Sequence, residues 1–330
     1  MTKYTLLVIP QIVFGGAYGA RDGKGRPMLD LSGQQLGNYR LVNLIGQGGF
    51  ADVYLGEHVF LRTRAAVKVL QVARMMPQSV QRFIKEAQTI ARLKHPHIVS
   101  VLDFGIERNM LFLIMEYVPN GTLHQRHPDG SVLSVKTLLH YVKQVAAALQ
   151  YAHDNKLVHR DIKPENMLVG ANNAILLSDF GLAVTAHRSQ SLSLQEQLGT
   201  IHYMAPEHFV GKARPASDQY SLGIVVYKWL CGWYPFDGAT EIEIMMKHLY
   251  SPPPPLRGIL PTLSPAVEAV VLRALAKNPD QRFVSVQVFA DALENACRKR
   301  QLLGQSSMAV MLRMRRLLSR GNIFSNIVLR

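Results

Sequence analysis

The stretch that most constrains this chain of 330 residues is Val158-His159-Arg160-Asp161-Ile162-Lys163-Pro164-Glu165-Asn166. It places an acid, a cation and an amide in one short loop behind a hydrophobic helix. Asp161 is suited to accept a proton, Lys163 to neutralise a moving anionic group, and Asn166 to hold a metal ion. A second carboxylate is found in Asp179-Phe180-Gly181, eighteen residues after Asp161. The rest of the chain is interpreted as the frame that holds these two segments.

Composition and charge narrow the class of protein. The chain is 48% hydrophobic and 18% charged, which is typical of a soluble globular protein. Cys231 and Cys297 stand far apart without a paired spacing, so we expect neither disulfides nor a zinc site, but a reducing, cytoplasmic setting. Of the formal charge of +14, eight Lys and Arg residues lie between Arg298 and Arg330, which leaves +6 for the rest. Specific nucleic-acid binding is therefore not predicted.

Residues 1–35 are expected to be a disordered N-terminal extension. The apolar run Leu6-Leu7-Val8-Ile9 is too short and too soon interrupted by Pro10 to span a bilayer. A secretory signal is the alternative, because Lys3 precedes this apolar run. We favour the disordered extension, since the residues after it have the composition of a cytoplasmic domain.

From Tyr39 the pattern becomes that of strands. Two runs, 39–45 and 51–56, flank Gly46-Gln47-Gly48-Gly49, which predicts a hairpin whose glycines would let backbone N–H groups approach a polyanion. A plain glycine-rich turn is the alternative. A third strand, 65–70, carries Lys68 among apolar neighbours, and Glu86 falls on the apolar face of the next helix. We expect Lys68 to pair with Glu86, the alternative being that both are exposed.

Two further runs, 98–104 and 111–118, complete a predicted five-stranded antiparallel sheet, and Pro119-Asn120-Gly121 ends it. The amphipathic pattern from Leu138 to Leu149 then opens a helical part. The fold class is α+β with two lobes: a small lobe of five strands and one helix at about 36–118, and a larger, mostly helical lobe at about 119–298. Residues 299–330 form a basic tail.

Together these motifs, in this order, resemble those of the protein kinases, and specifically the bacterial, eukaryotic-like Ser/Thr kinases. The resemblance covers about residues 36–298, and the third glycine of the family pattern is replaced by Ala51. It implies phosphorylation of Ser/Thr hydroxyls of proteins, and of the chain itself, from ATP with Mg²⁺ or Mn²⁺. The implied catalytic residues are Asp161, Lys163, Asn166, Lys68 and Glu86, with Asn166 and Asp179 as metal ligands. The implied nucleotide-binding residues are Ile45, Gly46, Gln47, Gly48, Gly49, Phe50, Ala51, Val53, Ala66, Lys68, Met115, Glu116, Val118 and Leu168.

The resemblance also implies regulatory and structural residues. Glu207 is expected to pair with Arg282, Asp218 to cap the helix 220–230 and bond the catalytic loop, and Thr200 to hydrogen-bond beside Asp161 and Lys163. Arg160 is expected to lack a counter-charge until Ser191 or Ser193 is phosphorylated.

Two alternative functions are weighed here, and the tail has alternatives of its own. A catalytically dead scaffold would lack a metal ligand or the lysine, and none is missing from the motifs. A small-molecule kinase is disfavoured by the complete segment 199–207. The basic and apolar run 308–318 suits weak contact with an anionic membrane at its inner face, or with a partner, or else a disordered tail.

Overall fold

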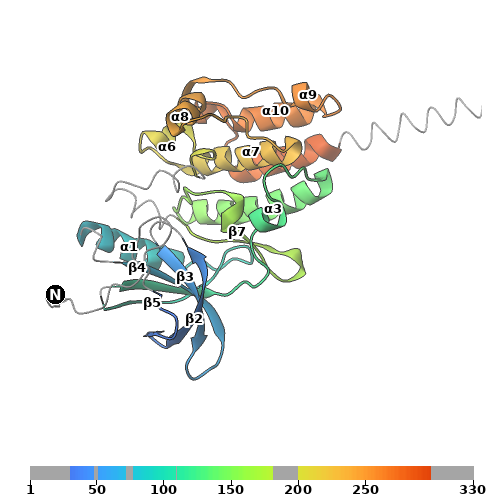
Figure 1. The fold of residues 1–330 in the computed structure, drawn as a ribbon. Coiled ribbons are helices and arrows are strands. Elements are labelled where there is room, and N and C mark those ends of the chain that lie inside the picture. Colours follow the sequence, from blue (N-terminus) through green and yellow to red (C-terminus); the bar gives the residue numbers. More distant parts are fainter. Residues whose placement is uncertain (1–29, 48–50, 72–76, 109, 181–199, 299–330) are drawn as a thin grey trace, which may run out of the picture.

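The computed structural model describes residues 30–47, 51–71, 77–108, 110–180 and 200–298. In these ranges the chain has a sheet lobe and a helical lobe, as Figure 1 shows. The two-lobed α+β architecture is the one predicted. Among the described residues, no helix is both long and apolar enough to cross a membrane.

One antiparallel sheet forms the first lobe. Its strands are β1 (Gln35–Leu36), β2 (Tyr39–Gln47), β3 (Ala51–His58), β4 (Arg64–Gln71), β5 (Val101–Glu107) and β6 (Met110–Glu116), in the spatial order β1-β2-β3-β4-β6-β5. The five long strands correspond to the predicted sheet. The prediction of five strands is corrected by one, because the two-residue β1 pairs with β2 at the edge.

The N-terminal boundary also differs from the prediction. Residues 30–35, expected to be disordered, cover the outer face of the sheet. Leu31 and Leu36 are buried there with Tyr54 and Phe112, and the Leu31 amide donates to the Tyr54 hydroxyl at 3.4 Å. Covering this face removes apolar strand residues from water, so the folded domain includes these residues.

The alternation of side chains along strand β4 explains why Lys68 points toward the helical lobe. Side chains alternate between faces along a strand, and here Ala65, Val67 and Val69 join the outer cluster while Ala66 and Leu70 join the inner one. Lys68 therefore points to the inner face, toward the helical lobe. Helix α1 (Pro77–Ile90) lies on this side, with Ala87 and Ile90 buried in the same inner cluster.

The helical lobe is built around α7 (Pro215–Cys231), which is buried from Ser217 to its last residue. Around it lie α2 (Leu123–Arg126), α3 (Val135–Asp154), α6 (Pro206–Phe209), α8 (Glu241–Tyr250), α9 (Leu256–Ile259), α10 (Pro265–Ala274) and a helical stretch at 286–298. The left-handed Gly232 ends α7 with φ 85°. A Cβ there would meet the Gly130 carbonyl oxygen at 3.0 Å, so the position also lacks room for a side chain.

The predicted catalytic loop lies between α3 and a small hairpin. A 3₁₀ turn at Pro164–Asn166 leads into β7 (Met167–Val169), which pairs with β8 (Ile175–Leu177). The hairpin turns through Asn172 and Asn173, both of which have a left-handed backbone. Its exit delivers Asp179 close to Asn166, because the Ser178 amide donates to the Asn166 carbonyl at 2.9 Å.

Candidate active site

Asp161 stands at the centre of the site. Its Oδ2 accepts from Asn166 Nδ2 at 2.9 Å and lies 3.0 Å from Lys163 Nζ. Lys163 Nζ in turn donates to Thr200 Oγ1 at 2.8 Å, which is the structural hydrogen bond predicted for Thr200. The carboxylate is thus held in one orientation by a cation and an amide. Such a held acceptor is what a proton-accepting group needs.

Asn166 fixes the loop on one side and offers an oxygen on the other. Its Nδ2 donates to both the backbone oxygen and Oδ2 of Asp161, at 2.8 and 2.9 Å. Both amide hydrogens are therefore used, and Asn166 Oδ1 is the atom left to accept or to coordinate. Asp179 supplies a second oxygen close by. Two hard oxygen ligands of this kind, completed by phosphates and water, suit Mg²⁺ or Mn²⁺. Among the described residues no group of three or more His, Cys, Asp or Glu side chains gathers as a self-sufficient metal site.

The buried His159, to which the sequence analysis assigns no role, holds the loop that carries Asp161. The His159 Nε2–H donates to the Ser178 carbonyl at 2.8 Å, while Nδ1 accepts from the Asp161 amide at 3.2 Å. This pair of bonds requires the neutral ring with its proton on Nε2. Burial lowers the pKa of His159 and outweighs the opposing effect of nearby carboxylates such as Asp218, which agrees with a neutral ring.

Asp218 connects α7 to the catalytic loop. Its carboxylate accepts from the backbone amides of His159 and Arg160, each at 2.8 Å, and from His153 Nε2 at 2.7 Å. The predicted bonding to the loop is confirmed. The predicted capping is wrong, because α7 begins at Pro215 and Asp218 lies inside its first turn. Burial would raise the pKa of Asp218, but these hydrogen bonds and the His153 charge lower it below the ordinary value.

Lys68 differs from the prediction in its partner. Its Nζ contacts Asp179 Oδ1 at 2.7 Å, whereas Glu86 Oε1 lies 3.3 Å from Arg160 Nη1. The expected Lys68–Glu86 pair is therefore not formed. The expectation that Arg160 lacks a counter-charge is also wrong, because Glu86 pairs with it. Burial would raise the pKa of Asp179, yet the charge and hydrogen bond of Lys68 lower it, so Asp179 is ionised. Helical spacing placed Glu86 on the correct side but could not choose between two nearby cations.

Several of the predicted nucleotide-binding residues lie on the inner side of the sheet. Register pairs Gly46 with Val53, Val53 with Lys68, and Ala66 with Met115. Ala66 and Met115 belong to the inner apolar cluster, and Ala51, Val53, Val118 and Leu168 pack against it. Ile45, Gln47 and Glu116 lie at the ends of β2 and β6. Gly48, Gly49, Phe50, Ser191 and Ser193 lie outside the described residues.

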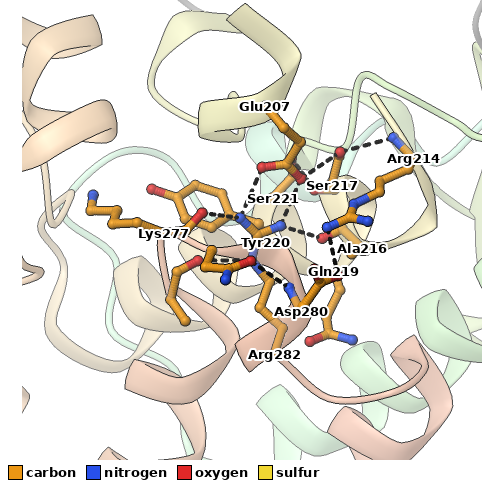
Figure 2. A network of polar contacts seen from close by, with 12 residues as sticks. Glu207, Arg214, Ala216, Ser217, Gln219, Tyr220, Ser221, Lys277, Asp280 and Arg282 are labelled. Carbon is orange, nitrogen blue, oxygen red and sulfur yellow. Dashed lines mark hydrogen bonds and ion pairs between the residues drawn. The ribbon is translucent and has the colours of Figure 1, made fainter. Parts of the chain in front are cut away.

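The predicted Glu207–Arg282 pair is present and belongs to a larger buried network (Figure 2). Arg282 Nη1 and Nη2 donate to the two Glu207 oxygens at 2.7 and 2.9 Å. Ser217 Oγ donates to Glu207 Oε1 at 2.6 Å. This network anchors α6, which comes a few residues after Thr200, to the body of the lobe.

A second polar cluster was not found from the sequence. Lys228, buried on α7, donates to Asp129 Oδ1 at 2.5 Å and to the hydroxyls of Tyr203 and Tyr234. In the sequence Lys228 is the one charged residue in the mainly apolar run 222–231, and only that exception signalled it. Through Tyr203 the cluster braces the segment that begins at Thr200.

A sheet lobe that presents a lysine to a loop with an aspartate, an asparagine and a second aspartate defines the class of the phosphotransferring kinases. The chain belongs to the protein kinase domain family, whose model matches residues 39–293. Members of this family use ATP and a divalent metal ion.

Among curated proteins the chain is similar to bacterial Ser/Thr kinases. It is 36% identical over 253 residues to serine/threonine-protein kinase PrkC of Bacillus subtilis, covering 76% of this chain and 39% of that protein. It is 38% identical over 274 residues to Pkn1 of Myxococcus xanthus, covering 81% of this chain and 39% of that protein. PknA of Mycobacterium tuberculosis is 39% identical over 264 residues, 78% of this chain and 61% of PknA. The chain thus matches less than two thirds of the length of each of these relatives.

Proposed function

We propose that this chain is a protein Ser/Thr kinase that transfers the γ-phosphoryl group of ATP to hydroxyls of proteins and of itself, with Mg²⁺ or Mn²⁺. The observation that carries the proposal is the oriented carboxylate of Asp161, held by Asn166 at 2.9 Å and by Lys163 at 3.0 Å. The similarity to bacterial Ser/Thr kinases supports the substrate class.

We assign roles to the residues from the family resemblance, and this geometry supports the assignment. Asp161 orients the substrate hydroxyl and takes its proton as the new O–P bond forms and the bond from the γ-phosphorus to the bridging oxygen breaks. Lys163, positioned by Thr200, neutralises charge on the group in transit. Asn166 and Asp179 would hold the metal ion, which would neutralise phosphate charge. Lys68 would bind phosphate oxygens.

The direct contact between Lys68 and Asp179 fits this assignment. At 2.7 Å each neutralises the other, so a cation suited to phosphate and an anion suited to metal are kept together. We expect nucleotide and metal to replace this contact. Among the described residues, an added Cβ at Gly46 would meet only Val53, at an ordinary 3.6 Å. Packing within the protein therefore does not require glycine there, which supports close approach of a ligand to the backbone.

We also propose a cytoplasmic site of action, with the run 308–318 giving weak contact with anionic membranes. The basis is the reducing setting suggested by composition and the mixture of basic and apolar residues in that run.

The test compares three purified proteins with labelled ATP and a generic protein substrate: the parent, Asp161→Asn and Asp154→Asn. Asp154 is the matched control, since it ends α3 and bonds only to Gln150 among the described residues. We expect transfer by the parent and the control, and a loss of at least about 100-fold in Asp161→Asn. No transfer by any of the three, with either metal, would favour a catalytically dead scaffold.

A further inference from the structure

The turn between β3 and β4, residues 59–63, presents two large apolar side chains to water. Phe60 and Leu61 are neighbours at its tip and are exposed by 82% and 69%. Neither belongs to an apolar cluster of the described part of the sheet lobe. Figure 1 shows this turn at the end of the sheet lobe that lies away from the helical lobe. Folding of the described chain therefore leaves both side chains unburied.

The backbone of the β3–β4 turn is fixed by its own hydrogen bonds. The His58 amide donates to the Thr63 carbonyl, and the Arg62 amide donates to the His58 carbonyl, both at 2.9 Å. The His58 ring atom Nδ1 accepts from the amides of Phe60 and Leu61, at 3.3 and 3.1 Å. The two apolar side chains are thus held on an ordered turn, at a place where a soluble protein gains nothing from them. Adjacent exposed apolar groups of this kind indicate an interaction site.

Three arginines surround the base of this turn and share one carboxylate. Glu57 pairs in register with Arg40 of β2 and with Arg64 of β4. Residues paired across strands point to the same face, so these three side chains form one row. Arg62 Nη1 contacts Glu57 Oε1 at 2.9 Å. This ion pair uses the carboxylate, and the four side chains together keep a net charge of +2 on an exposed edge of the lobe.

An apolar tip above a cationic base has the chemistry of a segment that enters the surface of an anionic membrane. Such segments place aromatic and aliphatic side chains at the boundary between headgroups and acyl chains, with basic side chains among the headgroups. Arginine suits this position because its guanidinium matches the geometry of a phosphate. Each basic residue near an anionic surface strengthens binding roughly fivefold.

A second copy of the chain fits this surface less well. Two such patches carry the same sign of charge and would repel each other. The two side chains at the tip also offer on the order of 300 Å², against roughly 800 Å² per partner in a standard stable interface. A bilayer requires no matching shape and admits a protruding tip. Charge and form together therefore favour a lipid surface.

We propose that the β3–β4 turn docks on a membrane surface rich in acidic phospholipids, with Phe60 and Leu61 at the acyl boundary and the three arginines on lipid phosphates. Gly46 pairs with Val53 near the start of β3, whereas the turn follows the last residue of this strand, His58. Docking therefore leaves the predicted nucleotide-binding end of the sheet free. This contact is separate from the run 308–318 and does not depend on the proposed kinase function.

Cosedimentation of the full chain with vesicles of phosphatidylcholine, alone or mixed with phosphatidylglycerol, tests the contact. Phe60→Ser/Leu61→Ser should lower the affinity for mixed vesicles about tenfold or more, because the apolar contribution is lost. Arg64→Gln should lower it roughly fivefold. Val284→Ser and Arg257→Gln are the matched controls, since both positions are exposed in the helical lobe, and they should bind as the parent does. Urea unfolding of each variant checks that its fold is intact.

Insertion into the bilayer has a signature of its own. Cys231 and Cys297 are both buried, so Leu61→Cys can be labelled selectively with an environment-sensitive fluorophore. Its emission should shift to shorter wavelength on mixed vesicles and should be quenched by a lipid with brominated acyl chains. The same label on Val284→Cys is the control and should show neither effect.

A chain without 308–318 separates the turn from the tail. Phe60→Ser/Leu61→Ser should lower the affinity by the same factor with and without this run. The proposal is overturned if the parent does not bind mixed vesicles, if the double variant binds as the parent does, or if the label at position 61 stays unshifted on vesicles that bind the chain. A shift without vesicles that grows with protein concentration would instead assign the turn to a second copy, and a shift with polyglutamate but not with vesicles would assign it to an acidic protein. None of these measurements uses phosphate transfer, so they are decisive whether or not the chain is an active kinase.

Discussion

Replacing Glu207 by Gln should unfold the chain more readily than any exposed charge substitution in the same network. Arg282 has a fully buried side chain, and its five N–H groups are all used: two on Glu207 and three on the backbone carbonyls of Ala216, Ala276 and Lys277. Glu207→Gln keeps the shape but removes the only carboxylate among these four partner residues. It also turns an amide N–H group toward a guanidinium, which has no acceptor to offer.

The expected loss can be worked from these contacts. A hydrogen bond to a charged group contributes about 1.5–3 kcal/mol, and two are weakened. Breaking a buried pair by removing one charge costs about 3–5 kcal/mol, since the other charge stays buried. We expect a loss in this range, which for a chain of this size lowers the melting temperature by roughly 1.5–2 °C per kcal/mol. Arg214→Gln is the matched control: its pair with Asp280 at 2.8 Å is exposed on both sides and should contribute less than about 1 kcal/mol.

The pH dependence gives a second, independent test. Burial would raise the pKa of Glu207, but the hydrogen bonds and charge of Arg282 lower it below the ordinary 4.5. A carboxyl whose folded pKa is lowered stabilises the fold above its unfolded pKa, and that contribution is lost as the pH falls through the folded value. Urea unfolding at several pH values should therefore show the full difference between parent and Glu207→Gln at pH 7 and a shrinking one below about pH 4.5. A loss at pH 7 as small as that of Arg214→Gln would refute the reasoning.

Three further outcomes are expected. Asp218→Asn, which leaves one oxygen for three donors, should cost about 2–4 kcal/mol in unfolding and lower kcat more than it raises KM, because it loosens the catalytic loop; an unchanged kcat in steady-state kinetics would contradict this. Ser191→Ala/Ser193→Ala should lower activity and remove phosphate detected by mass spectrometry after self-phosphorylation, and full activity in this variant would show that these serines do not regulate the enzyme. Deleting 308–318 should reduce pelleting with anionic vesicles, each basic residue contributing roughly 1 kcal/mol; equal pelleting with neutral vesicles would exclude the electrostatic contact.

Much of the fold is encoded in local patterns. Strand β4 alternates two buried faces and forms one apolar run interrupted by Lys68, and the Asn-Asn turn between β7 and β8 consists of residues that tolerate a left-handed backbone. The start of α7 was misplaced because an aspartate is a good cap, although Pro215 is the stronger signal for a first helical residue. Strand β1 could not be predicted, since two residues carry no periodicity.

Some contacts of the candidate site could be predicted from the sequence, and others could not. Contacts between residues of recognised motifs, such as Lys163–Thr200 and Glu207–Arg282, could be predicted because the family resemblance carries them over residue by residue. The neutral tautomer of His159 could not, because it depends on two partners that only the folded loop brings to opposite sides of the ring. The Lys228 cluster depends likewise on tyrosines that approach α7 from a later loop and an earlier segment.

Four charged residues between the lobes form ion pairs that the sequence alone does not predict. Two cations, Lys68 and Arg160, face two carboxylates, Glu86 and Asp179, and either pairing satisfies the rule that a buried charge needs a partner. The structure pairs Lys68 with Asp179 and Arg160 with Glu86. Arg160 and Asp179 both have a left-handed backbone, a conformation that costs about 1–3 kcal/mol and must be held by neighbouring contacts such as those of Asp218. Because the alternatives exchange one ion pair for another, residue type and spacing alone do not rank them, and we expect a bound polyanion or an added phosphate to change the pairing. The sequence motifs therefore identify the candidate site residues, while their ion pairing is settled only by the folded contacts.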